Sequence, residues 1–112
     1  MIPGSYDLCL YRGDTGRWRF QLWQDEGKTT PVDLTGATAL AQIRNAPGGT
    51  VLATPATTII APNLIDMVLS PADSQNLGPA GVWDLEVTYA SGDVATPIGG
   101  RVQVRQDVTR AA

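Results

Sequence analysis

The clearest pattern in the sequence is a strict alternation of apolar and polar residues between positions 82 and 89. One parity holds Trp83, Leu85, Val87 and Tyr89, and the other holds Val82, Asp84, Glu86 and Thr88. Successive side chains of a strand point to opposite faces, so this period of two predicts a half-buried strand. The turn residues 91–93 then predict a tight reversal. We expect a last strand within 94–105, with a kink at Gly99 and Gly100 and with Val102 and Val104 facing inward.

Weaker alternations predict four further strands, over 6–12, 17–24, 37–45 and 64–69. Their inward residues would be Tyr6, Leu8 and Leu10, then Trp18, Phe20 and Leu22, then Ala37, Ala39, Ala41 and Ile43, and finally Ile65, Met67 and Leu69. A helix is the alternative over 37–45, because Ala favours helices. The turn residues 47–49 favour a hairpin and hence a strand.

The connections carry turn signals of several kinds. Residues 25–28 predict a hairpin-type turn, and a short return segment would follow at 30–32. Asp33 begins a second reversal, in which its carboxylate can accept hydrogen bonds from the backbone amides just after it. Residues 50–60 contain Pro55, so we expect an irregular or bulged strand there.

A single helical signature lies at 70–78. Ser70 can cap the helix, Pro71 suits its first position, Asp73 suits its positive end, and Gly78 can close it. Two turns at most would fit, crossing between two sheets. Together with twelve Gly and eight Pro in 112 residues, these elements predict an all-β fold. We expect a single immunoglobulin-like antiparallel β-sandwich domain, residues 1–112, of seven or eight strands with one short connecting helix.

Composition narrows the classes of function. Eight Lys plus Arg against eleven Asp plus Glu give a net charge of −3, spread along the chain, which argues against nucleic acid as a partner. No apolar run reaches about 18 residues and no signal peptide is visible, so we expect a soluble protein with no membrane partner. With Cys9 as the one cysteine and no His, we expect no metal and no cofactor.

The outward-facing residues of the first two predicted strands form the candidate site. Tyr11 and Trp23 would share an exposed face with Arg17, Arg19 and Gln21. Aromatic residues and Arg dominate protein interfaces. Tyr11, Arg17, Arg19 and Trp23 are therefore our candidate protein interface, unless a second sheet covers Trp23.

Two other classes of function remain as alternatives. Asp14, Thr15 and Gly16 spell the loop of homodimeric aspartic proteases, whose two carboxylates share a proton, although Arg17 would then lie beside a carboxylate that must stay protonable. Trp23 and Tyr11 could instead stack on a sugar, as in a carbohydrate-binding module. No His is present to activate Cys9 or a hydroxyl, so we expect no enzyme.

Residues Pro31–Arg44 resemble small β-sandwich domains of tailed-phage virions, which occur at the start of baseplate upper proteins and in minor tail or long-tail-fibre proteins. In that family a Gly-Asp pair begins the second strand, as Gly13 and Asp14 would here. A Pro-Val-Asp-Leu-Thr-Gly turn precedes an outward-facing strand, as at 31–36, and a Leu-Gly turn precedes an alternating strand with Trp, as at 77–78 before Trp83. The closing residues 107–110 also fit.

The resemblance implies a virion structural protein, made in the host cytoplasm, that docks in multiple copies on other virion proteins of the tail, baseplate or capsid. A minor tail or baseplate component is the first expectation, and a capsid decoration protein is the alternative. Fibre and baseplate relatives continue from such a domain into long trimeric segments. This sequence stops at Ala112, so we expect docking rather than receptor binding.

Overall fold

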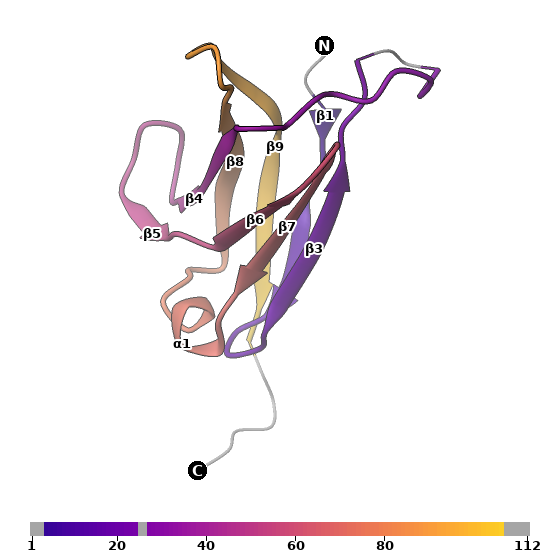
Figure 1. Ribbon diagram of the computed structural model, residues 1–112. Coiled ribbons are helices and arrows are strands. Elements are labelled where there is room, and N and C mark those ends of the chain that lie inside the picture. The colour runs from indigo at the N-terminus through magenta and orange to yellow at the C-terminus, as the bar shows by residue number, and fades with distance from the viewer. Residues whose placement is uncertain (1–3, 25–26, 107–112) are drawn as a thin grey trace.

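Nine strands and one short helix make up residues 4–24 and 27–106, the part of the chain that this computed structural model describes (Figure 1). The elements are β1 (Gly4–Ser5), β2 (Leu8–Tyr11), β3 (Gly16–Gln21), β4 (Thr38–Arg44), β5 (Val51–Ala53), β6 (Ala56–Ile60), β7 (Leu64–Leu69), α1 (Pro71–Ser74), β8 (Ala80–Thr88) and β9 (Val94–Arg105). The predicted turn at Asp25 and Glu26 and the predicted closing match at 107–110 lie outside the described residues.

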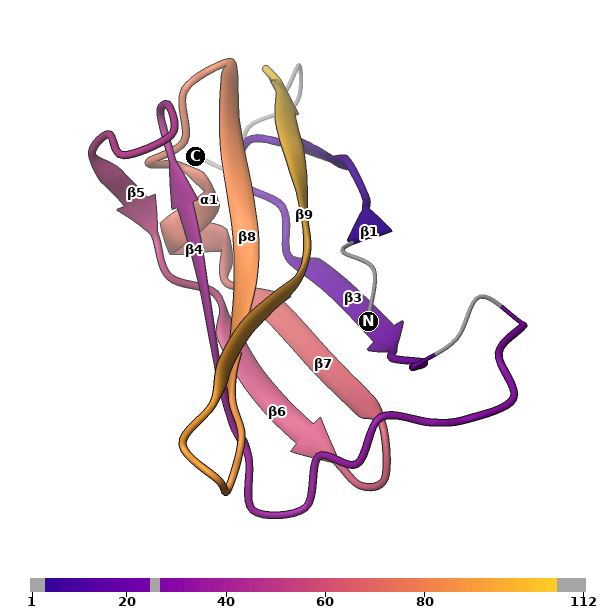
Figure 2. The same ribbon diagram turned by 90° about the horizontal axis from the view of Figure 1, so that it is seen from above.

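The strands form two sheets that pack face to face. The large sheet has the order β1-β9-β8-β4-β5, with β2 also paired to β9, and the small sheet has the order β3-β7-β6. Figure 2 shows the small sheet lying across one face of the large one. With β3 as the second strand of an immunoglobulin domain, the orders match its G-F-C and B-E-D strands. The predicted all-β sandwich is confirmed.

The hydrophobic alternation places the core between the sheets. In β8, Trp83, Leu85 and Val87 are buried whereas Asp84 and Glu86 are exposed, as predicted. The segment 38–44 is a strand and not a helix. It pairs with β8 over its whole length, and its residues Ala41 and Ile43 are buried in the core. Ile65, Met67 and Leu69 of β7 are fully buried from the opposite sheet.

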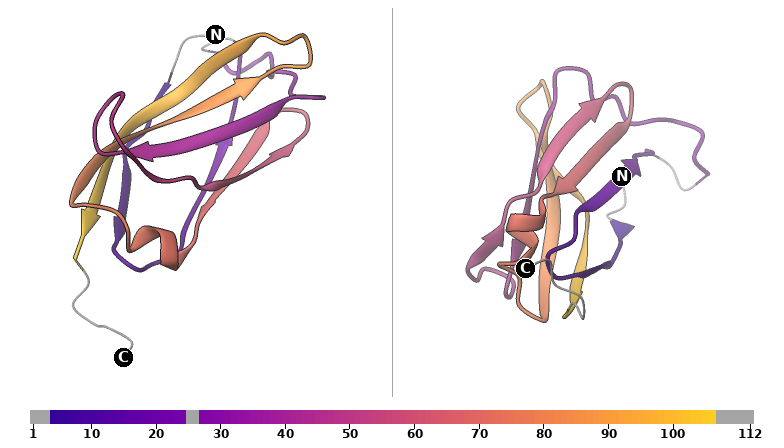
Figure 3. Two further views of the ribbon diagram at one scale, coloured as in Figure 1. Left: turned by 90° about the vertical axis from the view of Figure 1, so that its left-hand side faces the viewer. Right: turned by 90° about the horizontal axis from the view of Figure 1, so that it is seen from below.

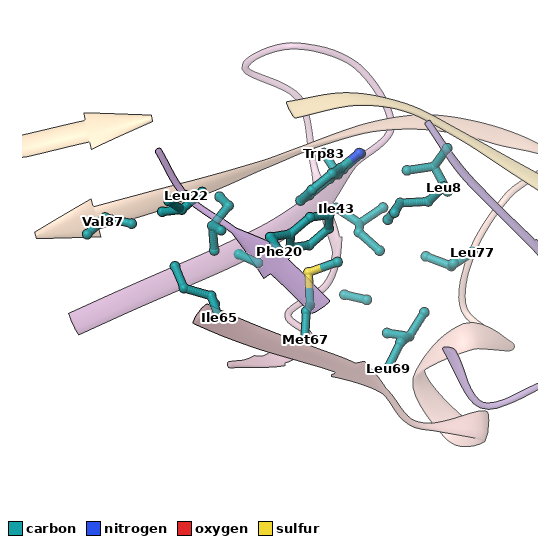
Figure 4. Packing of buried hydrophobic residues seen from close by; sticks show 14 of the residues in the cluster. Leu8, Phe20, Leu22, Ile43, Ile65, Met67, Leu69, Leu77, Trp83 and Val87 are labelled. Carbon is teal, nitrogen blue, oxygen red and sulfur yellow. The ribbon is translucent and has the colours of Figure 1, made fainter. Parts of the chain in front are cut away.

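Two aromatic rings connect the layers in the middle of this core. Phe20 of the small sheet stacks on Trp83 of the large sheet, with 5.5 Å between ring centroids and an interplanar angle of 24°. Figure 4 shows this stack, with Met67 beside Phe20. Tyr6 also contacts Phe20, edge to face, with 5.7 Å between ring centroids. Offset and edge-to-face pairs of this kind add to the stabilisation from buried area.

The predicted irregular strand at 50–60 is two strands in different sheets. β5 pairs with β4 in the large sheet, and β6 pairs with β7 in the small one. Thr54 and Pro55 connect them, and Pro55 is buried. Proline has no backbone N–H for a ladder, so it suits the point at which the chain leaves one sheet for the other.

The N-terminal strand joins the large sheet in parallel with the C-terminal one. β1 and β2 both pair in parallel with β9, and Tyr6 and Asp7 interrupt the ladder between them. The Asp7 carboxylate replaces the missing backbone acceptor, since it accepts the Arg101 N–H at 3.0 Å. The Tyr6 carbonyl, released from the ladder, accepts the indole N–H of Trp83 at 2.7 Å.

The predicted kink at Gly99 and Gly100 is wrong. Both residues pair in register with β8, and the irregularity of β9 lies between Ala95 and Ile98. Gly100 is required for another reason: a Cβ there would collide with the Tyr6 carbonyl oxygen. The glycine therefore permits the close approach of the first strand.

The short helix starts as predicted and ends earlier. Ser70 caps α1 by accepting the Asp73 N–H at 3.1 Å. The helix ends at Ser74, where Gln75 caps it in a right-handed conformation, so Gly78 is not the closing residue. α1 connects the small sheet to the large one, and buried Ser74 accepts the Gly13 N–H at 2.9 Å.

Candidate interaction surface

The outward face of the small sheet contains two of the four predicted interface residues, Arg17 and Arg19. The strand register aligns Arg17 with Val68 and Ala56, Arg19 with Asp66 and Thr58, and Gln21 with Leu64 and Ile60. The polar row of Arg19, Asp66 and Thr58 therefore lies between the row that holds the apolar pair Leu64 and Ile60 and the row that holds the smaller apolar residues Val68 and Ala56. We call these nine residues the small-sheet face.

A forked ion pair occupies the centre of the small-sheet face. Arg19 donates from Nε to Asp66 Oδ1 at 2.6 Å and from Nη2 to Oδ2 at 2.9 Å. These hydrogen bonds lower the pKa of the Asp66 carboxyl and raise that of the Arg19 guanidinium. Two parallel bonds fix the plane of the guanidinium, so Arg19 presents a defined polar surface.

A shallow depression lies on this face beside the ion pair. Its volume is about 260 Å³, and its lining residues are Arg17, Trp18, Arg19, Asp66, Met67 and Val68. Pockets for drug-sized ligands measure about 300–1,000 Å³ and are largely enclosed. The depression therefore suits contact with a protein surface better than capture of a small molecule.

Trp23 follows the same parity beyond the end of β3. It forms an isolated antiparallel bridge with Pro31, supported by hydrogen bonds from Gln24 N–H to Thr30 C=O at 2.8 Å and from Val32 N–H to Leu22 C=O at 3.1 Å. Its side chain is half-buried. The predicted return segment is thus a single bridge, and Trp23 offers only part of its ring to a partner.

Tyr11 lies apart from the other candidates. It belongs to β2 of the large sheet, opposite Arg105 of β9, and is 47% exposed. The outer faces of two packed sheets point in opposite directions, so the predicted sharing of one face by Tyr11, Arg17, Arg19 and Trp23 is wrong for Tyr11. The parity of each strand was correct, but parity does not reveal that β2 and β3 belong to different sheets.

Asp14, the candidate protease residue, is exposed in the turn that connects β2 with β3. Its N–H donates to the Tyr11 carbonyl at 3.1 Å, and Gly13 before it has a positive φ of 87°. The Asp-Thr-Gly triplet thus forms a strand-connecting turn in which Gly16 already begins β3.

Other predicted polar features are local. Asp33 accepts the Thr35 N–H at 3.0 Å, which confirms the predicted reversal and lowers the pKa of Asp33. Cys9 is an exposed free thiol.

Within residues 4–24 and 27–106, no three His, Cys, Asp or Glu side chains gather closely enough to hold a metal ion. In the same residues, no helix has the length and apolar character that a bilayer crossing requires.

Two residues of the outer surface did not stand out in the sequence. Asp66 was one of several scattered carboxylates, and only the register of β3 with β7 places it beside Arg19. Tyr6 was predicted to face inward, yet it is 46% exposed at the margin of the sandwich while its ring contacts Phe20. Parity within a strand could have found the side of each residue but not its partner across the sheet.

Comparison of the sequence with protein-family models and with curated proteins found no match.

Proposed function

We propose that this chain is a non-enzymatic structural protein of a tailed-phage virion, a minor tail or baseplate component that docks in multiple copies on other virion proteins. One observation supports the proposal most. The three short segments that resemble phage domains, at 13–14, at 31–36 and at 77–78, each lie directly before or at the approach to a strand of the sandwich: β3, β4 and β8. In the resembling family, too, such segments begin a strand or form the turn before one.

The small-sheet face supports a docking role on physical grounds. It combines fixed charge at Arg19 and Asp66, an exposed Arg17, the apolar residues Leu64 and Ile60, and a shallow depression beside the ion pair. Interfaces combine apolar contact with Arg and a polar rim. Three strands of about six residues cover roughly 300 Å², less than the ~800 Å² per partner of a stable pairwise interface. Such a face fits an assembly in which each copy has several neighbours.

The test is to purify particles from the phage or prophage that encodes this chain, and to measure its copy number in them by quantitative mass spectrometry. We expect a fixed number of copies per particle, and cryo-electron microscopy should locate sandwich-shaped density on the tail or baseplate. Density on the capsid shell would instead select the decoration role. Abundant chain in the lysate with none in purified particles would rule out both.

A further inference from the structure

The longest unbroken free strand edge in the described chain belongs to β3. This strand has one neighbour, β7, and no described residue pairs with its other side. In immunoglobulin constant domains the corresponding sheet has four strands, because the first strand pairs beside the second. Here β1 and β2 pair with β9 instead. The position next to β3 therefore has no strand among residues 4–24 and 27–106.

The register shows which backbone groups face this edge. Leu22 N–H donates to the Asn63 carbonyl at 2.9 Å, so residues at even positions of β3 bond to β7. The N–H and C=O groups of Arg17, Arg19 and Gln21 consequently point away from β7. They have no backbone hydrogen-bond partner in the described residues. They form a ladder that an added strand can complete.

An apolar strip lies beside this edge. β2 and β3 border the same margin of the sandwich, since the turn 12–15 joins them and Tyr6 contacts Phe20. In Figure 2 and in the right-hand view of Figure 3, β1 and β3 both lie at this margin of the sandwich. Tyr6 is 46% exposed, and Leu10 and Trp18 are only partly buried although both pack against the core. We call Tyr6, Leu10 and Trp18 the margin strip.

The other edges are shorter or covered. β6, at the opposite side of the small sheet, approaches β4, where the Thr57 hydroxyl donates to the Ala39 carbonyl at 2.8 Å. β5 has only three residues, and the interruption at Tyr6 and Asp7 breaks the edge of β1 and β2. Short or broken edges resist pairing with other chains. β3, with six residues, has neither protection.

We propose that β3 binds an extended segment of another virion protein as an added antiparallel or parallel strand, in which apolar residues alternate with acidic ones. The apolar residues of the added strand would cover the margin strip. Its acidic residues would lie next to Arg17 and Arg19. Arg17 is exposed and forms no ion pair within the described residues. This inference deepens the proposed docking function, because it specifies the partner's conformation and chemistry.

Charge argues against a second copy of this chain as the occupant. If β3 paired antiparallel with its own copy about a central Arg19, two Arg19 side chains would lie directly opposite each other. Like charges in directly opposed positions destabilise a sheet. An acidic strand meets no such repulsion.

The probe is the blocked peptide acetyl-Ser-Val-Glu-Val-Glu-Val-Ser-amide, titrated into the isotope-labelled full chain and followed by NMR. We expect saturable binding and slowed hydrogen exchange at the amides of Arg17, Arg19 and Gln21, while Trp18 and Phe20 are already protected by β7. A peptide with Lys for both Glu should bind about fivefold more weakly. A peptide of the same composition without the alternation, acetyl-Ser-Glu-Val-Val-Val-Glu-Ser-amide, should not slow hydrogen exchange at these amides.

A pair of variants isolates the backbone contribution. Gln21→Pro removes an edge N–H and should weaken binding about tenfold, whereas Gln21→Ala keeps that N–H and should bind normally. Peptide binding that leaves the three edge amides unprotected, or no binding at millimolar peptide, overturns the inference. Protection without peptide, together with dimers in sedimentation, would also overturn it by making a second copy the occupant. Peptide binding by a chain that purified particles lack would uphold the edge site and reject the virion role.

Discussion

Trp83 connects three parts of the fold through one side chain. Its ring stacks on Phe20 of the other sheet, and its indole N–H donates to the Tyr6 carbonyl at the break between β1 and β2. Only 4% of the residue is exposed. The same contact depends on Gly100, where a side chain would displace the Tyr6 backbone. Trp83 therefore fixes both the spacing of the layers and the path of the first strand.

Replacing Trp83 with Phe keeps an aromatic ring and removes the donor. The Tyr6 carbonyl then loses its partner, and we expect a cost of about 1–3 kcal/mol in the free energy of unfolding. Urea denaturation measures it. The matched control is Trp23→Phe at the half-buried tryptophan, which should cost less. Equal costs would show that the indole hydrogen bond is unimportant.

Asp66 predicts a pH dependence. Its folded-state pKa is lowered, chiefly by the hydrogen bond from Arg19, so its stabilisation is present above the unfolded pKa of about 3.9 and is lost as pH falls through the lower folded value. Asp66→Asn should melt at a lower temperature than the unsubstituted chain at pH 7. The difference should shrink steadily below about pH 4. A Tm difference that is constant from pH 7 to pH 2 would contradict this.

At the scale of elements, local patterns specified the strands but not their partners. The alternation in 82–89 and the small residues of 37–43 determine which face is buried, and both strands form as predicted. The sheet change at Thr54 and Pro55 and the parallel pairing of β2 with β9 depend on contacts between distant residues. Of the candidate site, the exposure of Arg17 and Arg19 was predictable from parity, and the separation of Tyr11 was not.

One hydrogen bond that the sequence pattern does not reveal connects the short helix to the β2–β3 turn. Ser74 is fully buried, and its hydroxyl accepts the Gly13 N–H from the β2–β3 turn. Ser74→Ala leaves that N–H without its partner, so we expect a loss of about 1–3 kcal/mol. The control is Ser70→Ala, which removes only the cap and should cost about 1 kcal/mol. Thermal and urea unfolding compare the two variants. A larger loss of stability in Ser70→Ala than in Ser74→Ala would show that the hydrogen bond to Gly13 is unimportant.

For the whole molecule, the two outer faces are expected to differ in importance for assembly. Trp23→Ala should lower incorporation into particles more than it lowers the melting temperature, because the partner loses an aromatic contact. Tyr11→Ala on the opposite face is the matched control and should incorporate normally. Incorporation is counted by mass spectrometry of purified particles. Normal incorporation of the soluble Trp23→Ala fraction, with a large drop in melting temperature, would assign Trp23 to folding alone.

The parallel pairing of β2 with β9 has a mechanical consequence. β2 runs beside β9 over four consecutive residue pairs, from Leu8 with Val102 to Tyr11 with Arg105. A pull that draws the beginning of β2 and the end of β9 apart is directed along both strands, so it loads these hydrogen bonds in shear and all together. An antiparallel terminal pair would instead open one bond at a time. We therefore expect the β2–β9 pair to resist tension applied along it, and single-molecule stretching should show one high-force rupture.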